Sequence, residues 1–274
     1  MVTRIVSAAV AIVIAAVVLF LHDTIVFYFA VSLLTLLMLY EIFHAAGCLK
    51  YRLTTVVCFL FGAFMPFFYY EKIESFRYFF LTACLAIIFI TYILQHKALT
   101  FEKLCIMITS SVLITLSMNA MISIKESNEK HGLFLLVLSL CGAWLADSGA
   151  FFKGTFFGKH KLCPEISPKK TIEGVIGGTI TNALLFILIG FVYTKFQSAN
   201  DISVSFNYFY LALFGMACSL LGLLGDLSAS LVKRQFQIKD YGNIMPGHGG
   251  AMDRFDSVLF VIPFMYLFSG YLFK

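Results

Sequence analysis

The chain is organised around residues 226 to 257, which read DLSASLVKRQFQIKDYGNIMPGHGGAMDRFDS. Eight of its residues are charged, in a chain where charged residues make up only 13%. Strongly apolar segments lie on both sides of it. A membrane protein tolerates such a polar island only where water, a metal ion or a substrate meets it. The stretch therefore predicts a functional site among membrane-spanning helices.

A stripe of small and polar side chains leads into this island if the preceding segment is a helix that turns about 100° per residue. The stripe consists of Gly215, Ser219, Gly222, Asp226, Ser230 and Lys233. Its small residues fit a packing seam between membrane helices equally well. A packing seam does not account for Asp226 or Lys233, so the polar end of the stripe points to the site.

The composition indicates an all-α, polytopic integral membrane protein. The chain has 274 residues and is 60% hydrophobic, whereas soluble domains are about 45–50% apolar. About nine apolar segments are long enough to cross a bilayer, at about 20 residues per crossing. They are 4–21, 24–45, 53–70, 76–95, 101–123, 133–152, 172–195, 207–232 and 255–273.

We interpret residues 1–274 as a single membrane domain in which 1–130 are mainly scaffold and 131–274 hold the catalytic spans and loops. With the N-terminus in the cytoplasm, 14 of the 20 Lys and Arg residues fall on the cytoplasmic side, as the positive-inside rule requires. This orientation predicts a multi-pass protein of the cell (inner) membrane. It also places the polar islands 147–174 and 226–257 at the cytoplasmic face.

The first island opens at Asp147, near the end of an apolar segment, where an acid usually has a partner or a function. Glycines among lysines follow at 153–161, including Lys159. Such a loop lets the backbone approach a phosphate closely, although it equally fits a collar against lipid headgroups.

The sequence SPKKTIEG at 167–174 predicts a helix start, with Ser167 as N-cap and Pro168 as the first helical residue. Lys169 and Lys170 would then lie at a helix N-terminus, which favours anions. Positive-inside anchoring is the alternative for the two lysines. Gly174, with Gly178 four residues later, provides a small face for close helix packing.

The second island combines acids with cations. Carboxylates, waters and substrate phosphates are the usual ligands of Mg²⁺, so Asp226 and Asp253 are the predicted metal pair. The basic residues suit a polyphosphate; they are Lys233, Arg234, Lys239 and Arg254. The flexible sequence PGHGG at 246–250 brings His248 and backbone N–H groups together. A triphosphate with Mg²⁺ fits this loop better than a transported cation does.

These stretches together resemble the phosphatidate cytidylyltransferase (CDP-diacylglycerol synthase) family. The resemblance rests on the Ser and Lys-Arg after Asp226, Lys-Asp at 239–240, Pro-x-His-Gly-Gly at 246–250 and Asp-Arg-x-Asp at 253–256, with 147–161 and 167–174 upstream. They cover about the last half of the chain in the family's order. Thr155, Met245 and Ala251 depart from the family's usual residues, and Thr155 removes one expected basic contact.

The resemblance implies an enzyme that uses CTP, phosphatidic acid and Mg²⁺ to make CDP-diacylglycerol and pyrophosphate for phospholipid biosynthesis. It implies catalytic roles for Asp226, Lys233, Asp253 and His248, the two acids holding the metal. The implied substrate-binding residues are Asp147, Lys159, Lys169, Lys170, Arg234, Lys239, Asp240, Arg254 and Asp256. Asp240 and Asp256 are second choices as metal ligands.

The expected partners are CTP, phosphatidic acid and membrane lipids, with no nucleic acid. Members of the family are dimeric, which implies a homodimer that the sequence itself does not show. Two other interpretations stay open. One is a CTP-dependent kinase of a lipid alcohol, or a cytidylyltransferase for another lipid phosphate. The other is an ion-coupled transporter whose intramembrane acids form a relay.

Overall fold

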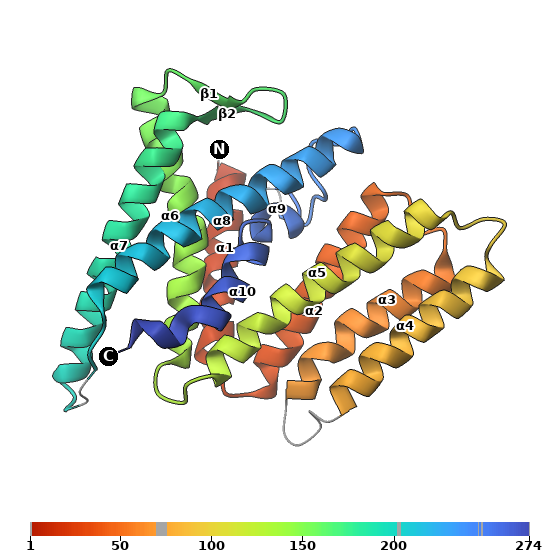
Figure 1. The fold of residues 1–274 in the computed structure, drawn as a ribbon, viewed down its shortest axis with the longest axis horizontal. Helices are drawn as coiled ribbons and strands as arrows, with labels where there is room; N and C mark the ends of the chain where they lie inside the picture. Colours follow the sequence, from red (N-terminus) through yellow and green to blue (C-terminus); the bar gives the residue numbers. More distant parts are fainter. Residues whose placement is uncertain (1, 70–75, 202–203, 246, 248, 274) are drawn as a thin grey trace. The chain divides into compact units, whose positions relative to one another are not determined.

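The computed structural model describes residues 2–69, 76–201, 204–245, 247 and 249–273. The described chain is almost entirely helical, with one short hairpin (Figure 1), which confirms the all-α class. It packs as two compact units. The first unit comprises Met1–Ser123 and Gln235–Phe255, and the second comprises Ile124–Arg234 and Asp256–Lys274.

Seven helical segments within the described residues are long and apolar enough to cross a membrane. They are Ile25–Ala45, Arg52–Tyr69, Phe76–Leu94, Phe101–Glu126, Gly132–Phe157, Ile172–Ser198 and Tyr208–Gln235. The first and last predicted segments are helical too, but their apolar stretches, Val6–Phe20 and Val258–Leu272, are shorter. The polytopic membrane class is therefore confirmed, whereas nine full-length spans are not.

The first unit is built around α2, whose side chains Met38, Leu39 and Phe43 are completely buried. α2 packs against α1, α3 and the short helix α9, and α3 packs against α4. The elements of this unit are α1 (Val2–Phe20), α2 (Ile25–Ala45), α3 (Arg52–Phe64), η1 (Met65–Tyr69), α4 (Phe76–Leu94), most of α5 (Phe101–Glu126) and α9 (Met252–Phe255).

The second unit is built around α6 and α7, which lie side by side (Figure 1). Its elements are α6 (Gly132–Phe157), β1 (Lys161–Cys163), β2 (Ser167–Thr171), α7 (Ile172–Ser198), α8 (Tyr208–Gln235), α10 (Val258–Phe268) and η2 (Ser269–Leu272). β1 and β2 pair antiparallel, with Lys161 opposite Thr171. This hairpin connects α6 to α7, and β2 contacts both helices.

Helix α7 has two faces that repeat every four residues. One face is apolar and more than half exposed, as suits contact with lipid; it carries Ile176, Ile180, Leu184 and Leu188. The other face is buried and consists mostly of small residues; it carries Gly174, Gly178, Asn182, Phe186 and Gly190. Small residues let helix backbones approach each other in a membrane, so the second face is the packing face.

The glycines of this face mark where backbones meet. A Cβ atom at Gly178 would lie 2.9 Å from the backbone nitrogen of Ala150 in α6, and one at Gly174 would lie 2.8 Å from the carbonyl oxygen of Ala150. On α8, a Cβ atom at Gly215 would lie 2.8 Å from the Cα of Ala183 in α7. The packing role predicted for Gly174 and Gly178 is confirmed, and so is that of Gly215 in the small-residue stripe.

Gly178→Ala should destabilise the protein by about 1–3 kcal/mol, because the added methyl group forces the backbones of α6 and α7 apart. Thermal unfolding in detergent measures this as a lower midpoint. Gly270→Ala in η2 of the same unit is the matched control, since a Cβ atom there would meet nothing within 4 Å. Equal midpoints for the two variants would contradict the packing interpretation.

Candidate active site

The helix start predicted at Ser167 is wrong by four residues. Ser167 to Thr171 form β2, and α7 begins at Ile172. Thr171 is the N-cap, and its Oγ1 accepts the N–H of Gly174 at 3.1 Å. Proline suits an extended backbone as well as a first helical turn, because it fixes only φ and lacks a donor. Pairing with β1 therefore decides between the two conformations.

The strand separates the two lysines that the predicted helix had grouped together. Successive side chains of a strand point to opposite faces, and Lys169 is exposed while Lys170 is half-buried. Lys170 forms an ion pair with Asp226 of α8, and the two side chains are only 20% and 25% exposed. Of the two lysines, Lys170 is therefore the one that contacts Asp226, the predicted metal ligand.

Two further acids, Asp147 and Asp256, lie near Asp226 in the second unit. Ser230 donates to Asp226 Oδ1 at 3.3 Å. Ser257 donates its hydroxyl to Asp147 Oδ2 at 3.1 Å and its backbone N–H to Asp256 Oδ1 at 2.7 Å. Both Asp147 and Asp256 are close enough to Asp226 to interact with it electrostatically. The structure therefore brings together acids of both polar islands, Asp147 from the first and Asp226 and Asp256 from the two ends of the second.

The charges of this cluster suit a bound cation. Burial, followed by the nearby carboxylate of Asp226, raises the pKa of the Asp256 side chain to about 7, and Lys233 acts in the opposite direction. A cation would favour the ionised form of Asp256, and carboxylate oxygens are ligands that Mg²⁺ accepts. Among the residues that the structure describes, no three His, Cys, Asp or Glu side chains lie together so as to hold a metal ion by themselves. Mg²⁺ binding therefore stays a prediction.

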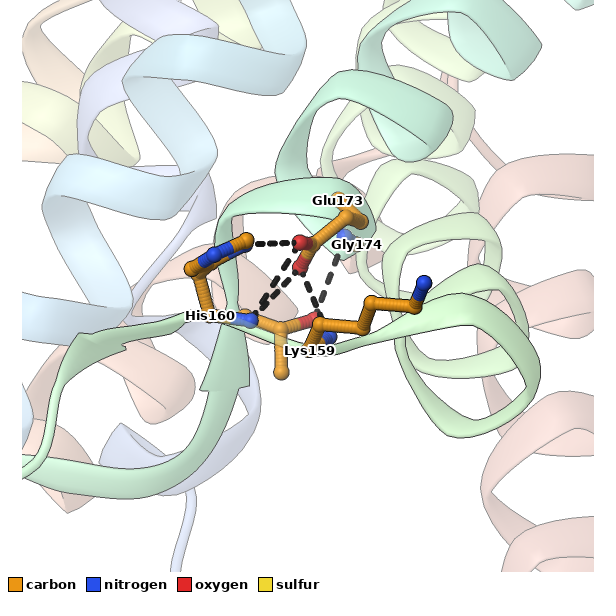
Figure 2. Close-up of polar contacts among 5 residues, drawn as sticks. Lys159, His160, Glu173 and Gly174 are labelled. Carbon is orange, nitrogen blue, oxygen red and sulfur yellow. Dashed lines mark hydrogen bonds and ion pairs between the residues drawn. The ribbon is translucent and has the colours of Figure 1, made fainter.

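The carboxylate of Glu173 binds Lys159 and His160, just before the hairpin, and we call these contacts the Glu173 clasp (Figure 2). The carboxylate accepts the backbone N–H groups of Lys159 and His160 at 3.1 and 3.2 Å. It also contacts His160 Nδ1 at 2.6 Å. The sequence reasoning assigned no role to Glu173, although an acid in the first turn of a helix is a signal for such contacts. The clasp fixes the backbone of Lys159, whose side chain is exposed.

The first unit holds the rest of the second polar island. Asp253 Oδ2 accepts the backbone N–H groups of Tyr241 at 2.8 Å and Gly250 at 3.1 Å. Gly249 has a φ of +86°, a conformation that favours glycine. The Asp253 carboxylate therefore holds Tyr241 and Gly250 of the loop 241–250.

The other predicted site residues divide between the two units. Arg234 lies in the second unit, where its Nε donates to the carbonyl of Ile166 at 3.3 Å. Lys239, Asp240 and Arg254 lie in the first unit with exposed side chains. His248, together with Pro246, lies outside the described residues, so its role stays a prediction. The same holds for the pairing of Asp226 with Asp253, because the two belong to different units.

The chain is similar to known sequences over most of its length. Residues 2–272 match the sequence model of the Cytidylyltransferase family. The chain belongs to this family. A phosphatidate cytidylyltransferase of Bacillus subtilis is 39% identical over 181 residues, which are 66% of this chain and 64% of the relative.

Two other bacterial phosphatidate cytidylyltransferases match this chain over shorter stretches. The phosphatidate cytidylyltransferase of Staphylococcus haemolyticus is 42% identical over 139 residues, or 51% of this chain and 50% of the relative. That of Haemophilus influenzae is 41% identical over 138 residues, or 50% and 46%. The matched part thus spans between about half and just under two-thirds of these relatives' length.

Glu173→Gln should loosen the hairpin, because an amide offers one acceptor oxygen where the carboxylate offers two. We expect trypsin to cut at the exposed lysines 159, 161 and 169 about fivefold faster, with little change in the unfolding midpoint. Glu165→Gln, in the exposed turn between the strands, is the matched control and should leave the cleavage rate unchanged. Equal cleavage in both variants would show that the clasp does not hold the hairpin.

Proposed function

We propose that this protein transfers CMP from CTP to phosphatidic acid, giving CDP-diacylglycerol and pyrophosphate. The observation that carries the proposal is the pairing of Lys170 with Asp226, with Asp147 nearby. These residues come from the three stretches that resemble the family, and they meet in one unit among helices of membrane-spanning length. The names of the matched relatives support the same reaction.

In this reaction a phosphate oxygen of the lipid attacks the α-phosphorus of CTP. The bond between the α-phosphorus and the oxygen bridging to the β-phosphate breaks, and pyrophosphate leaves with the electron pair. The lipid phosphate is already anionic, so no general base is needed. Such transfers depend mainly on positioning and on stabilising charge, and the cluster supplies both with fixed charges.

We assign the chain's residues accordingly. Lys170 exchanges its contact with Asp226 for a contact with a substrate phosphate. Lys233, Arg234, Lys239 and Arg254 bind CTP and pyrophosphate, while Lys159 and Lys169 face the anionic headgroup. Asp226 and Asp253 would hold Mg²⁺, with Asp240 and Asp256 as second choices, and Asp147 and His248 would line the site. When bound, Mg²⁺ neutralises charge on the phosphate oxygens.

We further propose that the site faces the cytoplasm, where the charge distribution puts both polar islands and where CTP is made. The bacterial relatives support placement in the cell (inner) membrane. The homodimer implied by the family resemblance stays a prediction, as does the expectation that no nucleic acid binds.

The deciding experiment incubates the purified protein in mixed micelles with phosphatidic acid, Mg²⁺ and each of the four ribonucleoside triphosphates in turn. We expect liponucleotide and pyrophosphate in equal amounts from CTP. A product that carries only one added phosphate, made from a lipid alcohol and CTP, would instead identify a lipid kinase. Absence of any product, with no stabilisation by CTP and Mg²⁺, would overturn the proposal and favour a transporter.

Lys170→Gln should lower kcat/KM by about 100-fold, because it removes a positioned cation from the charge that develops on the phosphates. Lys161→Gln is the matched control, since Lys161 is an exposed lysine of the paired strand β1 without an assigned role, and it should stay within about threefold of the wild type. Steady-state rates per folded molecule measure both. Full activity of Lys170→Gln would reduce this lysine to a membrane anchor.

Asp226→Asn and Asp253→Asn should each abolish turnover, with the double variant little worse than either single one, as for residues that act as a unit. Asp253→Asn is the sharper test. The backbone N–H groups of Tyr241 and Gly250 both go to one oxygen of Asp253, so the amide oxygen of asparagine can keep these two contacts while the charge is lost. Activity of Asp253→Asn near the wild-type rate, with unchanged Mg²⁺ dependence, would show that Asp253 only shapes the loop.

A further inference from the structure

Glu41 is a buried acid in α2, the central helix of the first unit. It is 2% exposed, and a carboxylate in such a position is costly unless it is fully hydrogen-bonded. Its Oε1 accepts the backbone N–H of Ala251 at 2.9 Å, and its Oε2 accepts that of Met252 at 2.8 Å. Both oxygens are therefore engaged by the backbone of a segment about 210 residues later in the chain.

The two N–H groups lie where α9 begins. The first N–H groups of a helix have no acceptor within the helix, so Glu41 supplies acceptors that α9 cannot supply itself. The next two residues are Asp253 and Arg254, which we assign to the metal and to CTP. A side chain of α2 thus fixes the backbone from which two proposed site residues project.

The carboxylate of Glu41 also explains why two positions of the loop are occupied by glycine. A Cβ atom at Gly242 would lie 2.5 Å from Glu41 Oε1, and one at Gly250 would overlap with the carboxylate group. The loop therefore passes against Glu41 at two points where any larger residue would push it away. Gly250 also donates to Asp253, so the two carboxylates hold adjacent parts of one loop.

We propose that Glu41 is a positioning residue for the nucleotidyl transfer. Its carboxylate fixes the backbone of residues 250–252 and thereby sets where Asp253 and Arg254 lie, without touching substrate. An ion or proton relay through Glu41 is disfavoured, because both of its oxygens already accept backbone N–H groups. The effect on catalysis rests on the proposed function, whereas the effect on the loop does not.

The test compares Glu41→Gln with the wild type in two measurements. The amide keeps the shape of the side chain, but its NH₂ group cannot accept, so one of the two N–H groups loses its partner. Hydrogen–deuterium exchange of peptides covering 249–255 should become about tenfold faster. The kcat should fall by about 10- to 100-fold per folded molecule, with the KM for CTP and for lipid within about threefold.

Glu102→Gln is the matched control, since Glu102 is an exposed acid in the first turn of α5 in the same unit. It should change neither exchange nor kcat. Gly242→Ala is a second variant that leaves Glu41 intact but pushes its carboxylate away, and it should reproduce the loss of kcat. Gly242→Ala therefore keeps the proposal testable if Glu41→Gln does not fold, and full activity of that variant would then overturn it.

The outcomes separate the two proposals. Unchanged exchange in Glu41→Gln overturns the role in the loop. Faster exchange with an unchanged kcat, or a lower unfolding midpoint with full activity in the folded fraction, reduces Glu41 to a purely structural residue. If the wild type makes no liponucleotide, the proposed function fails on its own, and the exchange comparison still decides whether Glu41 fixes the loop.

Discussion

The close approach of helix backbones in the second unit is the constraint on which the candidate site depends. Gly178 lets α7 touch α6, and Gly215 lets α8 touch α7. Asn182 joins all three helices, because its side-chain NH₂ group donates to the carbonyls of Gly142 at 3.1 Å and Gly215 at 2.8 Å. Membrane helices gain little from hydrophobic association and rely on such packing and hydrogen bonds. The helices that carry Asp147 and Asp226 are thus held together by residues without chemistry of their own.

Four acids have specific partners, as a low-dielectric setting requires. Asp226 pairs with Lys170, and Asp147 accepts from Ser257. Asp253 and Glu41 instead accept backbone N–H groups. The two kinds of partner indicate two kinds of role. A pair of side chains can exchange for substrate groups, whereas Glu41, with a backbone N–H group on each oxygen, shapes the chain around it.

The hairpin shows where local sequence signals were insufficient. Ser-Pro followed by two lysines is compatible with a helix start and also with a strand, since proline only restricts φ. The structure selects the strand because residues 161–163 lie in position to pair with it. Glu41 was missed for a related reason. An acid near the end of an apolar segment was visible, but its partners lie about 210 residues away.

Composition and local patterns were enough to predict the class of protein, the order of its helices and the residue types that we propose for the site. Apolar length and the spacing of small residues act locally, so they can be read from one segment at a time. Only the tertiary structure decided which charges meet: that Lys170 and not Lys169 reaches Asp226, that Asp147 and Asp256 join it, and that Glu41 holds the loop of Asp253. Such contacts depend on how distant segments pack, and no local pattern contains that information.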